Sequence, residues 1–306
     1  MTKFREIAGG LKFPEGPIAM PDGSVIVVEI ARGTLTRVKN DGTAQVIADL
    51  GGGPNGAAIG PDGAVYVCNN GGFHYGEAAG LLVPGDRSRN YSGGRIERVE
   101  PGTGKVDVLY TECSGHKLNA PNDIVFDSSG GFWFTDYGHD HDRVSDRGAV
   151  YYAKPDGSMI REVIFPLHRP NGIGLSADES TLYVAETFTC RLWGFPVSAP
   201  GDVDMPATPL QFAPIYCSPT FKFFDSLAVD GAGRVCVASI LEGGISVISP
   251  DDGSLVESVT TGDPLTTNIC FGGHGLKTAY ITCSGTGRLL ACDWPKGGQK
   301  LNFLNS

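Results

Sequence analysis

Residues 54–67 read PNGAAIGPDGAVYV, and residues 170–184 read PNGIGLSADESTLYV. Both stretches have a small polar start, a short apolar strand, a turn rich in Asp or Gly, and a second apolar strand. This pattern predicts two β-hairpins of the same register. Six such segments occur in the chain, at residues 13–30, 53–70, 120–138, 169–187, 224–240 and 266–284. The chain is therefore built from an internal repeat.

A third strand follows each hairpin, and a fourth usually follows after another turn, as at residues 33–38 and 43–49. Four antiparallel strands that recur roughly every 40 to 55 residues are typical of propeller blades, which close radially and protect their edges. No segment has the period of an amphipathic helix of useful length. The sequence predicts an all-β chain that forms one six-bladed β-propeller domain over residues 1–306, with four antiparallel strands per blade.

Two segments depart from the regular repeat. Residues 71–93 are an insertion between the second and third strands of blade two, and long insertions of this kind are often lids or binding loops. Residues 4–8 resemble an outer strand without a blade of its own, so we expect this N-terminal strand to close the ring in blade six. The tail at residues 300–304 competes for the same place.

Charge and composition narrow the classes of partner. The formal net charge is -10, and no run of Lys or Arg occurs, so we expect neither nucleic acid nor a membrane surface as a partner. The N-terminus lacks the apolar core of a signal peptide, and no apolar run approaches the length of a membrane span. We expect a soluble, cytoplasmic protein, as a monomer or a small homo-oligomer, that acts on a small molecule.

One polar residue recurs at the start of each repeat. In register, these positions hold Glu15, Asn55, Asn122, Asn171, Asp225 and Asn268, which we call the polar ring. The first strand of each propeller blade lines the central tunnel, so six oxygen-bearing side chains are expected to converge at one depth. The alternative is that Asn and Asp merely cap the turns before strands.

An all-oxygen donor set with two carboxylates suits a hard divalent cation. Ca²⁺ is favoured because it tolerates an irregular arrangement of protein oxygens, whereas Zn²⁺ usually takes His or Cys; Zn²⁺, Mg²⁺ and Mn²⁺ remain alternatives. The residues that end the second strands, such as Glu29, Asp136, Tyr137 and Glu186, are candidates for the walls of a substrate cup, and Tyr137 is a candidate substrate-binding residue.

The ring is similar to that of the senescence marker protein, gluconolactonase and luciferin-regenerating enzyme family, six-bladed propellers that include lactonases and diisopropyl fluorophosphatases. The resemblance spans nearly the whole chain. It is carried by PEGP at residues 14–17, PND at 121–123, RPNG at 169–172 and FDSLAVD at 224–230. It implies that Glu15, Asn171 and Asp225 are metal ligands and that Asn122 binds the ion or the substrate.

The chain also departs from that family. Ala120 stands where gluconolactonases with a sugar-binding arginine carry it, so their way of holding a sugar acid does not transfer. His274, in the last blade, resembles the tunnel histidine of the fluorophosphatases, with a histidine in a hairpin turn as the alternative. Asn55 and Asn268 of the ring, and His74 and Tyr75 of the insertion, are further candidate substrate-binding residues. The loop at residues 138–142, GHDHD, is expected to be solvated rather than a metal site.

Together these features predict a metal-dependent hydrolase that opens a lactone, most simply a sugar-acid lactone such as gluconolactone. The ion would polarise the ring carbonyl, and Asp225 would act as general base or as nucleophile. No Gly-x-Ser-x-Gly motif is present, which disfavours a serine hydrolase. Two alternatives remain, a phosphotriester or fluorophosphate hydrolase that uses the same metal site, and a ligand-binding propeller without catalysis.

Overall fold

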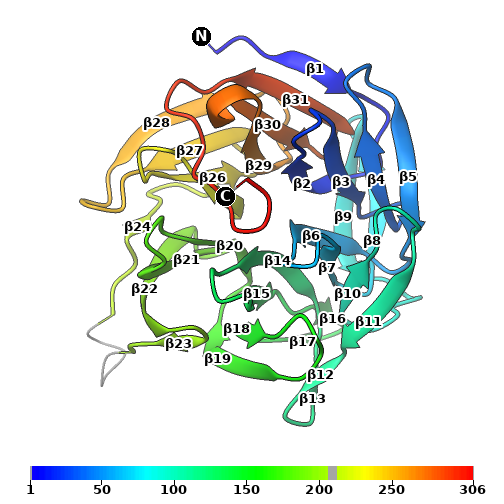
Figure 1. Cartoon of the computed structure of the whole chain (residues 1–306), viewed down its shortest axis with the longest axis vertical. Helices are drawn as coiled ribbons and strands as arrows, with labels where there is room; N and C mark the ends of the chain where they lie inside the picture. The colour runs from blue at the N-terminus through cyan, green and yellow to red at the C-terminus, as the bar shows by residue number, and fades with distance from the viewer. Residues whose placement is uncertain (1, 206–211, 306) are drawn as a thin grey trace.

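The computed structural model describes residues 2–205 and 212–305. Six antiparallel sheets surround a central tunnel, as blades of a six-bladed β-propeller (Figure 1). The predicted fold class is confirmed.

The innermost strands are β2 (Pro14–Ala19), β6 (Pro54–Ile59), β14 (Pro121–Phe126), β20 (Pro170–Leu175), β25 (Phe224–Val229) and β29 (Thr266–Gly272). The second strands are β3 (Val25–Glu29), β7 (Val65–Asn69), β15 (Phe132–Asp136), β21 (Thr181–Glu186), β26 (Val235–Ser239) and β30 (Thr278–Cys283). The third are β4 (Thr34–Val38), β10 (Arg95–Val99), β18 (Gly148–Ala153), β22 (Arg191–Ala199), β27 (Gly244–Ile248) and β31 (Arg288–Asp293).

The outer position varies more than the inner ones. It holds β5 (Ala44–Asp49), β11 (Val106–Tyr110), β19 (Ile160–Leu167) and β28 (Leu255–Thr260) in blades one, two, three and five. In blade four, two short strands pair with β22 instead, namely β23 (Asp202–Val203) and β24 (Tyr216–Cys217). Five blades therefore have the expected four regular strands. In blade four, two short strands share the outer position.

The core lies between the faces of neighbouring blades. Second strands such as β3, β7, β15 and β26 are buried along their whole length, since each is covered by a blade on both sides. Between blades two and three, for example, the rings of Tyr66, Phe126 and Phe132 contact one another at centroid distances of 5.1 to 5.8 Å. This face-to-face packing explains why these strands are continuous apolar runs.

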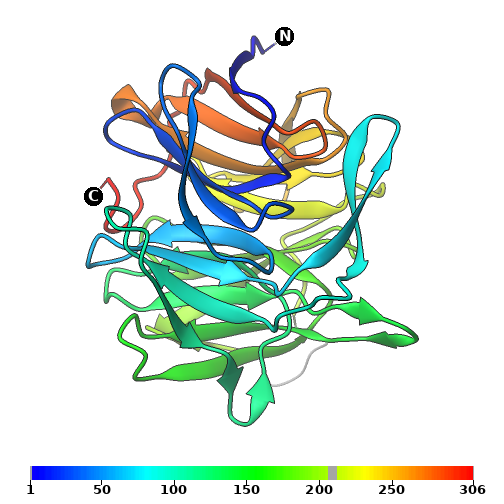
Figure 2. The ribbon, with the colours of Figure 1, turned by 90° about the vertical axis from the view of Figure 1, so that its right-hand side faces the viewer.

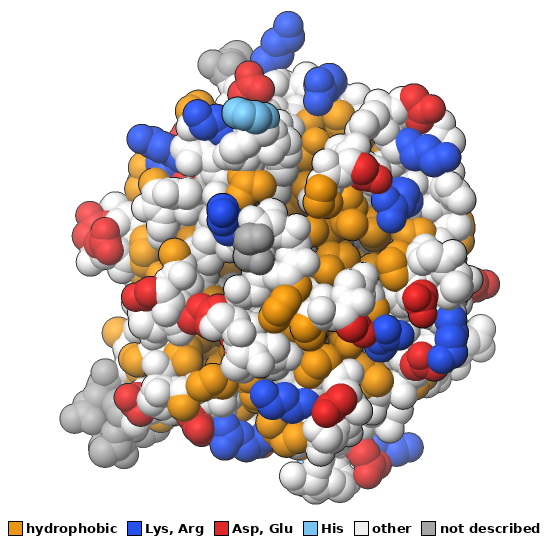
Figure 3. All heavy atoms as spheres, in the orientation of Figure 1, with side chains coloured by type: hydrophobic (Ala, Val, Ile, Leu, Met, Phe, Trp, Pro, Cys, Tyr) orange, Lys and Arg blue, Asp and Glu red, His pale blue; other side chains and the backbone are white. Residues whose placement is uncertain are grey.

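The N-terminal strand closes the ring, as expected. β1 (Arg5–Ala8) pairs antiparallel with β31, with Arg5 opposite Ala291. The competing assignment of residues 300–304 is wrong, because the tail turns over one end of the tunnel (Figure 1). There Gln299 Nε2 donates to the Leu175 carbonyl at 3.0 Å and Asn302 Nδ2 to the Phe126 carbonyl at 3.1 Å. On this face, charged side chains of both signs are interspersed, with hydrophobic groups beside the tail (Figure 3).

The insertion in blade two forms a hairpin of β8 (Phe73–Ala78) and β9 (Leu81–Arg87). It stands at the end of the tunnel opposite the C-terminal tail (Figure 2). Two smaller hairpins complete the strands, β12 (Glu112–Cys113) with β13 (His116–Lys117) and β16 (Asp140–His141) with β17 (Val144–Ser145). A short 3-10 turn, η2 (His274–Leu276), joins β29 to β30. Within the residues described, no helix is long and apolar enough to cross a membrane.

His139 anchors the insertion. Its ring lies against those of Phe73 and Tyr91, at centroid distances of 4.8 and 5.1 Å. Its Nε2 donates to the Asn70 carbonyl at 2.9 Å, since a carbonyl can only accept. The expectation that the whole 138–142 loop is solvated is therefore wrong for His139, which is buried.

Acid is expected to weaken this anchor. Burial lowers the pKa of His139 below its ordinary value of 6.5; Arg87 and Arg169 lower it further, while the Asn70 carbonyl and Asp146 oppose the shift. Because the folded-state pKa is the lower one, this stabilisation is complete above pH 6.5 and is lost as the pH falls. We expect the free energy of unfolding, from urea titrations, to decrease on acidification more in the wild type than in His139→Gln. An identical decrease in both proteins would contradict this role.

Candidate functional site

β-bulges aim the polar ring at the tunnel axis. Every innermost strand loses regular pairing with the second strand of its blade at or beside the ring residue. Asp225 lies in the gap between Phe224 and Leu227 of β25, whereas Glu15 is paired and the gap follows it. A bulge leaves residues unpaired and redirects their side chains. An irregularity at this level in all six blades therefore accompanies the turn of six equivalent side chains toward one centre.

The glycines that follow three of the ring residues allow the innermost strands to approach closely. A Cβ at Gly16 would lie 2.6 Å from the Asn55 carbonyl oxygen, and one at Gly56 would lie 2.4 Å from that of Asn122. A Cβ at Gly172 would lie 2.7 Å from the Asp225 carbonyl oxygen. These three blades thus pack backbone on backbone against the next blade, so the Glu-Gly or Asn-Gly pair is a packing requirement as well as a turn signal.

Blade three carries an acid where those blades carry glycine. Asp123 is buried beside the ring, and its Oδ1 accepts from the Ile124 amide at 2.9 Å. This carboxylate was not among the predicted site residues. Its position after Asn122, in register with three glycines, was the sequence signal that could have identified it.

Most of the predicted site residues meet in one cavity of about 440 Å³, at the end of the tunnel that carries the insertion. Glu15, Asn55, Asn122, Asn171 and Asp225 form its floor, and Tyr75 and Tyr137 belong to its walls. Asp225 keeps 8% of its surface exposed and Glu15 only 2%. Asp225 is therefore the more accessible carboxylate of the floor.

Three floor oxygens are buried without a hydrogen-bond partner among the described residues. They are Glu15 Oε1, Asn122 Oδ1 and Asn171 Oδ1. The opposite edges of two of these groups are fixed, because Glu15 Oε2 accepts from Asn268 Nδ2 at 2.7 Å and Asn171 Nδ2 donates to Thr187 Oγ1 at 3.2 Å. Buried polar atoms without partners are costly, so three of them together indicate a place suited to bind a ligand.

The donor set fits a hard divalent cation. Two carboxylates, from Glu15 and Asp225, and two carboxamide oxygens, from Asn122 and Asn171, supply oxygen only and two negative charges. In the part of the chain that the structure describes, no group of three His, Cys, Asp or Glu side chains is placed to hold a metal ion. A metal centre in this cavity therefore depends on the asparagines.

Burial raises the pKa values of all three carboxyl groups, and neighbouring carboxylates add to the shift in Glu15 and Asp225. Burial raises the pKa of Glu15 to about 8, with Asn268 opposing and Asp123 adding to the shift. Burial raises the pKa of Asp225 well above its ordinary value, and the Glu15 charge adds to that shift. Burial also raises the pKa of Asp123 to about 7. This cluster lacks positive charge, which a bound cation would supply.

Three candidate substrate-binding residues lie outside the cavity. Asn268 orients Glu15 and borders the other half of the tunnel. His74 is exposed on the outer face of β8, because neighbouring residues of a strand point to opposite sides and Tyr75 points inward. His274 is exposed in η2, beyond the end of β29 that is remote from the ring. The structure therefore places neither His74 nor His274 in this cavity, contrary to the prediction that they bind the substrate there.

The acidic residues at the ends of the second strands accept hydrogen bonds from backbone amides and do not line the cavity. Glu29 Oε2 accepts from the Lys12 amide at 2.8 Å, and Glu186 Oε1 accepts from the His168 amide at 2.7 Å. Asp136 accepts from the amides of Asn119 and Ala120, both at 2.7 Å. These carboxylates hold the chain just before an innermost strand, so of that candidate set Tyr137 alone lines the cavity.

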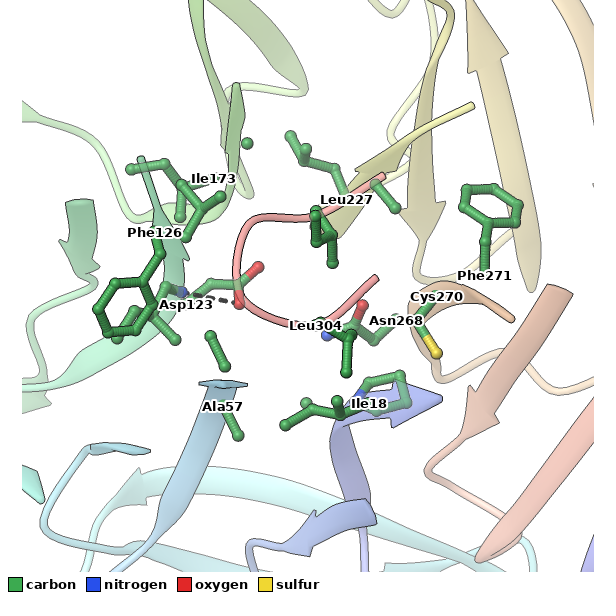
Figure 4. Close-up of a pocket in the computed structure, with 18 of the residues that line it drawn as sticks. Ile18, Ala57, Asp123, Phe126, Ile173, Leu227, Asn268, Cys270, Phe271 and Leu304 are labelled. Atoms are coloured by element: carbon green, nitrogen blue, oxygen red, sulfur yellow. Dashed lines mark hydrogen bonds between the residues drawn. The ribbon is translucent and has the colours of Figure 1, made fainter. Parts of the chain in front are cut away.

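The other half of the tunnel is a separate apolar chamber (Figure 4). Asp123 and Asn268 border it, and its walls include Ile18, Ile173 and Leu227. Leu304 of the C-terminal tail lies across it. The polar ring thus separates a covered apolar chamber from the open cavity.

Known proteins match most of the chain. The gluconolactonase of Zymomonas mobilis is 27% identical over 308 residues, which cover 92% of this chain and 79% of that protein. Lactonase drp35 of Staphylococcus saprophyticus is 26% identical over 279 residues, which cover 88% and 75%. A solved gluconolactonase of Xanthomonas campestris has a TM-score of 0.75 at 23% identity, covering 96% of this chain and 90% of that one.

The fold is shared more widely than the sequence. The calcium-binding protein regucalcin of Agrobacterium tumefaciens has a TM-score of 0.74 at 17% identity, covering 98% of both chains. The family model described as SMP-30/Gluconolactonase/LRE-like region matches residues 13–285, which include all six members of the polar ring. The chain therefore belongs to the SMP-30/gluconolactonase/LRE-like family.

Proposed function

We propose that this chain is a divalent-metal-dependent lactonase, a carboxylic ester hydrolase that opens a lactone ring with water. The observation that carries the proposal is the cavity floor, where three unpaired buried oxygens lie beside the accessible carboxylate of Asp225. Relatives at 26 to 27% identity are a gluconolactonase and a lactonase, which supports lactones as the substrate class.

We assign Glu15, Asn122, Asn171 and Asp225 as the residues that would hold the cation, with Ca²⁺ as the favoured ion. A divalent cation bound there would stabilise the negative charge that develops on the carbonyl oxygen during attack. Zn²⁺, Mg²⁺ and Mn²⁺ are the competing ions, and metal titration of chelated protein distinguishes them.

Asp225 is proposed as the general base. Its carboxylate takes a proton from water while the water oxygen forms a bond to the carbonyl carbon. The bond between this carbon and the ring oxygen then breaks, and the proton returns from Asp225 to the departing alkoxide. The product is one hydroxy acid, whose carboxyl group then releases its proton to the solvent. If Asp225 were the nucleophile instead, it would form an anhydride with the opened lactone, and attack of ¹⁸O-labelled water on the aspartyl carbonyl in a single turnover would leave the label on Asp225.

Removal and return of metal tests the function directly. Protein treated with chelator is expected to lose lactone opening, measured as acid release, and to regain it when Ca²⁺ is added. Gluconolactone, a sugar-acid lactone, is the reference substrate because a relative carries its name. An unchanged rate after chelation would overturn the metal-dependent mechanism.

Assays distinguish a lactonase from the two alternatives, a phosphotriester or fluorophosphate hydrolase and a ligand-binding propeller. The case for a phosphotriester or fluorophosphate hydrolase drew on His274, which lies away from the cavity, so that case now rests on the ring alone. Turnover of an organophosphate in preference to every lactone would favour it. A ligand-binding propeller would show no activity that Asp225→Ala abolishes.

Removing the Tyr75 hydroxyl is expected to lower activity without lowering stability. This hydroxyl is buried, has no hydrogen-bond partner among the described residues, and keeps its proton because burial raises its pKa well above 10. It is therefore available to donate to a substrate oxygen, and Tyr75→Phe should reduce kcat/KM roughly 100-fold. In the matched variant Tyr91→Phe, by contrast, a hydroxyl that donates to the Asn119 carbonyl at 2.6 Å is lost. Unfolding by urea should show a loss of about 1 to 2 kcal/mol for Tyr91→Phe only.

A further inference from the structure

The walls of the cavity are largely apolar above its polar floor, although Asp86 and Arg87 of β9 add charged groups on the insertion side. The insertion supplies one wall, where strand alternation turns Phe73 and Tyr75 of β8 inward and β9 adds Val83. Tyr75 packs against Phe13 at a centroid distance of 5.2 Å, which fixes this wall to blade one. A ligand on the floor therefore meets mainly hydrocarbon on this side, together with the Tyr75 hydroxyl.

The opposite wall is a run of aromatic and aliphatic side chains from loops of blades three to five. Tyr137, Phe188 and Phe223 follow one another at centroid distances of 6.5 and 5.4 Å. Leu241 continues the lining. Phe188 remains 49% exposed and Leu241 54% exposed. Large apolar side chains exposed beside a buried polar site mark a surface that a ligand covers.

Arg169, a positively charged residue of this wall, already binds other groups of the protein. The buried guanidinium of Arg169 donates to the Tyr137 carbonyl at 3.1 Å and to Ser145 Oγ at 3.0 Å, and it also pairs with Asp140. It lies over the Tyr137 ring, 5.1 Å from the centroid. These contacts use three of its five N–H groups, and a substrate hydroxyl buried against this wall without a partner would be penalised.

We propose that the preferred substrate is a lactone whose ring carries an alkyl chain, with the ester group on the polar floor and the chain along Phe188, Phe223 and Leu241. This inference rests on the proposed lactonase function and narrows its substrate class. Each methylene that leaves water for such a wall is worth up to roughly fourfold in affinity. A five-carbon chain that is half covered should then gain about 30-fold.

Three substrates test this preference with the metal-loaded full chain: δ-decalactone, δ-valerolactone and glucono-δ-lactone. Initial rates of acid release should give a kcat/KM for δ-decalactone about 30-fold above that for δ-valerolactone and also above that for glucono-δ-lactone. A glucono-δ-lactone value equal to or above the δ-decalactone value overturns the inference and leaves the lactonase function standing. If none of the three is opened, the lactonase function itself falls, and this inference with it.

Single substitutions locate the chain-binding wall. Phe188→Ala should reduce kcat/KM for δ-decalactone about tenfold more than it reduces kcat/KM for δ-valerolactone. The matched control is Phe221→Ala, because Phe221 is 76% exposed and contacts Phe223 but does not line the cavity. This control should change neither value. Equal losses on both substrates in Phe188→Ala would overturn the assignment of this wall.

Discussion

Asp225→Asn is expected to lower kcat for lactone opening by about 1000-fold while the protein remains folded. Asparagine keeps the shape of the side chain but cannot take a proton from water. The variant should not lose stability in the absence of metal. Burial and the Glu15 charge raise the pKa of Asp225, which means that the folded metal-free protein disfavours its charged form. Steady-state rates with added Ca²⁺ and urea titrations without it measure the two effects.

A second buried aspartate serves as the control. Asp230 lies outside the cavity, where it pairs with Arg234 and accepts from the amides of Ala232 and Arg234 at 2.9 and 3.0 Å. Asp230→Asn should therefore destabilise the protein, by about 3 kcal/mol or more if the pair breaks, and leave kcat unchanged. If Asp225→Asn kept more than about a tenth of wild-type kcat, Asp225 would not be the general base.

The repeat made the fold and the floor of the cavity predictable from sequence. Glu15, Asn55, Asn122, Asn171 and Asp225 share one register, and propeller geometry brings one register to one depth. Glycine after three of these residues strengthened the alignment, because the innermost strands approach so closely that a Cβ would clash. These were local signals repeated around a ring.

The predictions that failed needed the position or orientation of a side chain, which the register of the repeat does not give. His274 is six residues beyond Asn268, and a strand rises about 3.3 Å per residue, so it lies roughly 20 Å along the tunnel from the ring. His74 and Tyr75 are neighbours on one strand, and only the packing of Tyr75 against Phe13 decides which of them faces inward. Asn268 has both a donor and an acceptor edge, and sequence does not reveal that its amide nitrogen is used by Glu15.

The apolar walls could be predicted only in part. Tyr75 and Tyr137 were candidate substrate-binding residues, whereas Phe188, Phe223 and Leu241, from loops of two blades, were not identified. Their contacts depend on how loops of different length fold over the rim. The wall residues therefore change the substrate class that we propose, whereas the floor consists of residues that the sequence predicted.

Glu15→Gln is expected to weaken Ca²⁺ binding at least 100-fold, which calorimetry on chelated protein would detect without any activity assay. In the wild type, Glu15 Oε2 accepts from Asn268 and Gly16, and Oε1 stays free toward the cavity. The single oxygen of the substituted glutamine side chain must accept these hydrogen bonds, so its amide NH₂ occupies the place of the free oxygen and cannot ligate a cation. At 100 times its Kd, Ca²⁺ should raise the free energy of unfolding of the wild type by about 2.7 kcal/mol and that of the variant by much less.

Asn55→Ala is the control, because Asn55 lines the same floor but holds none of the unpaired oxygens, so it should bind Ca²⁺ like the wild type. Equal Ca²⁺ affinity in Glu15→Gln and the wild type would mean that the cation, if one binds, is held elsewhere than on the polar ring.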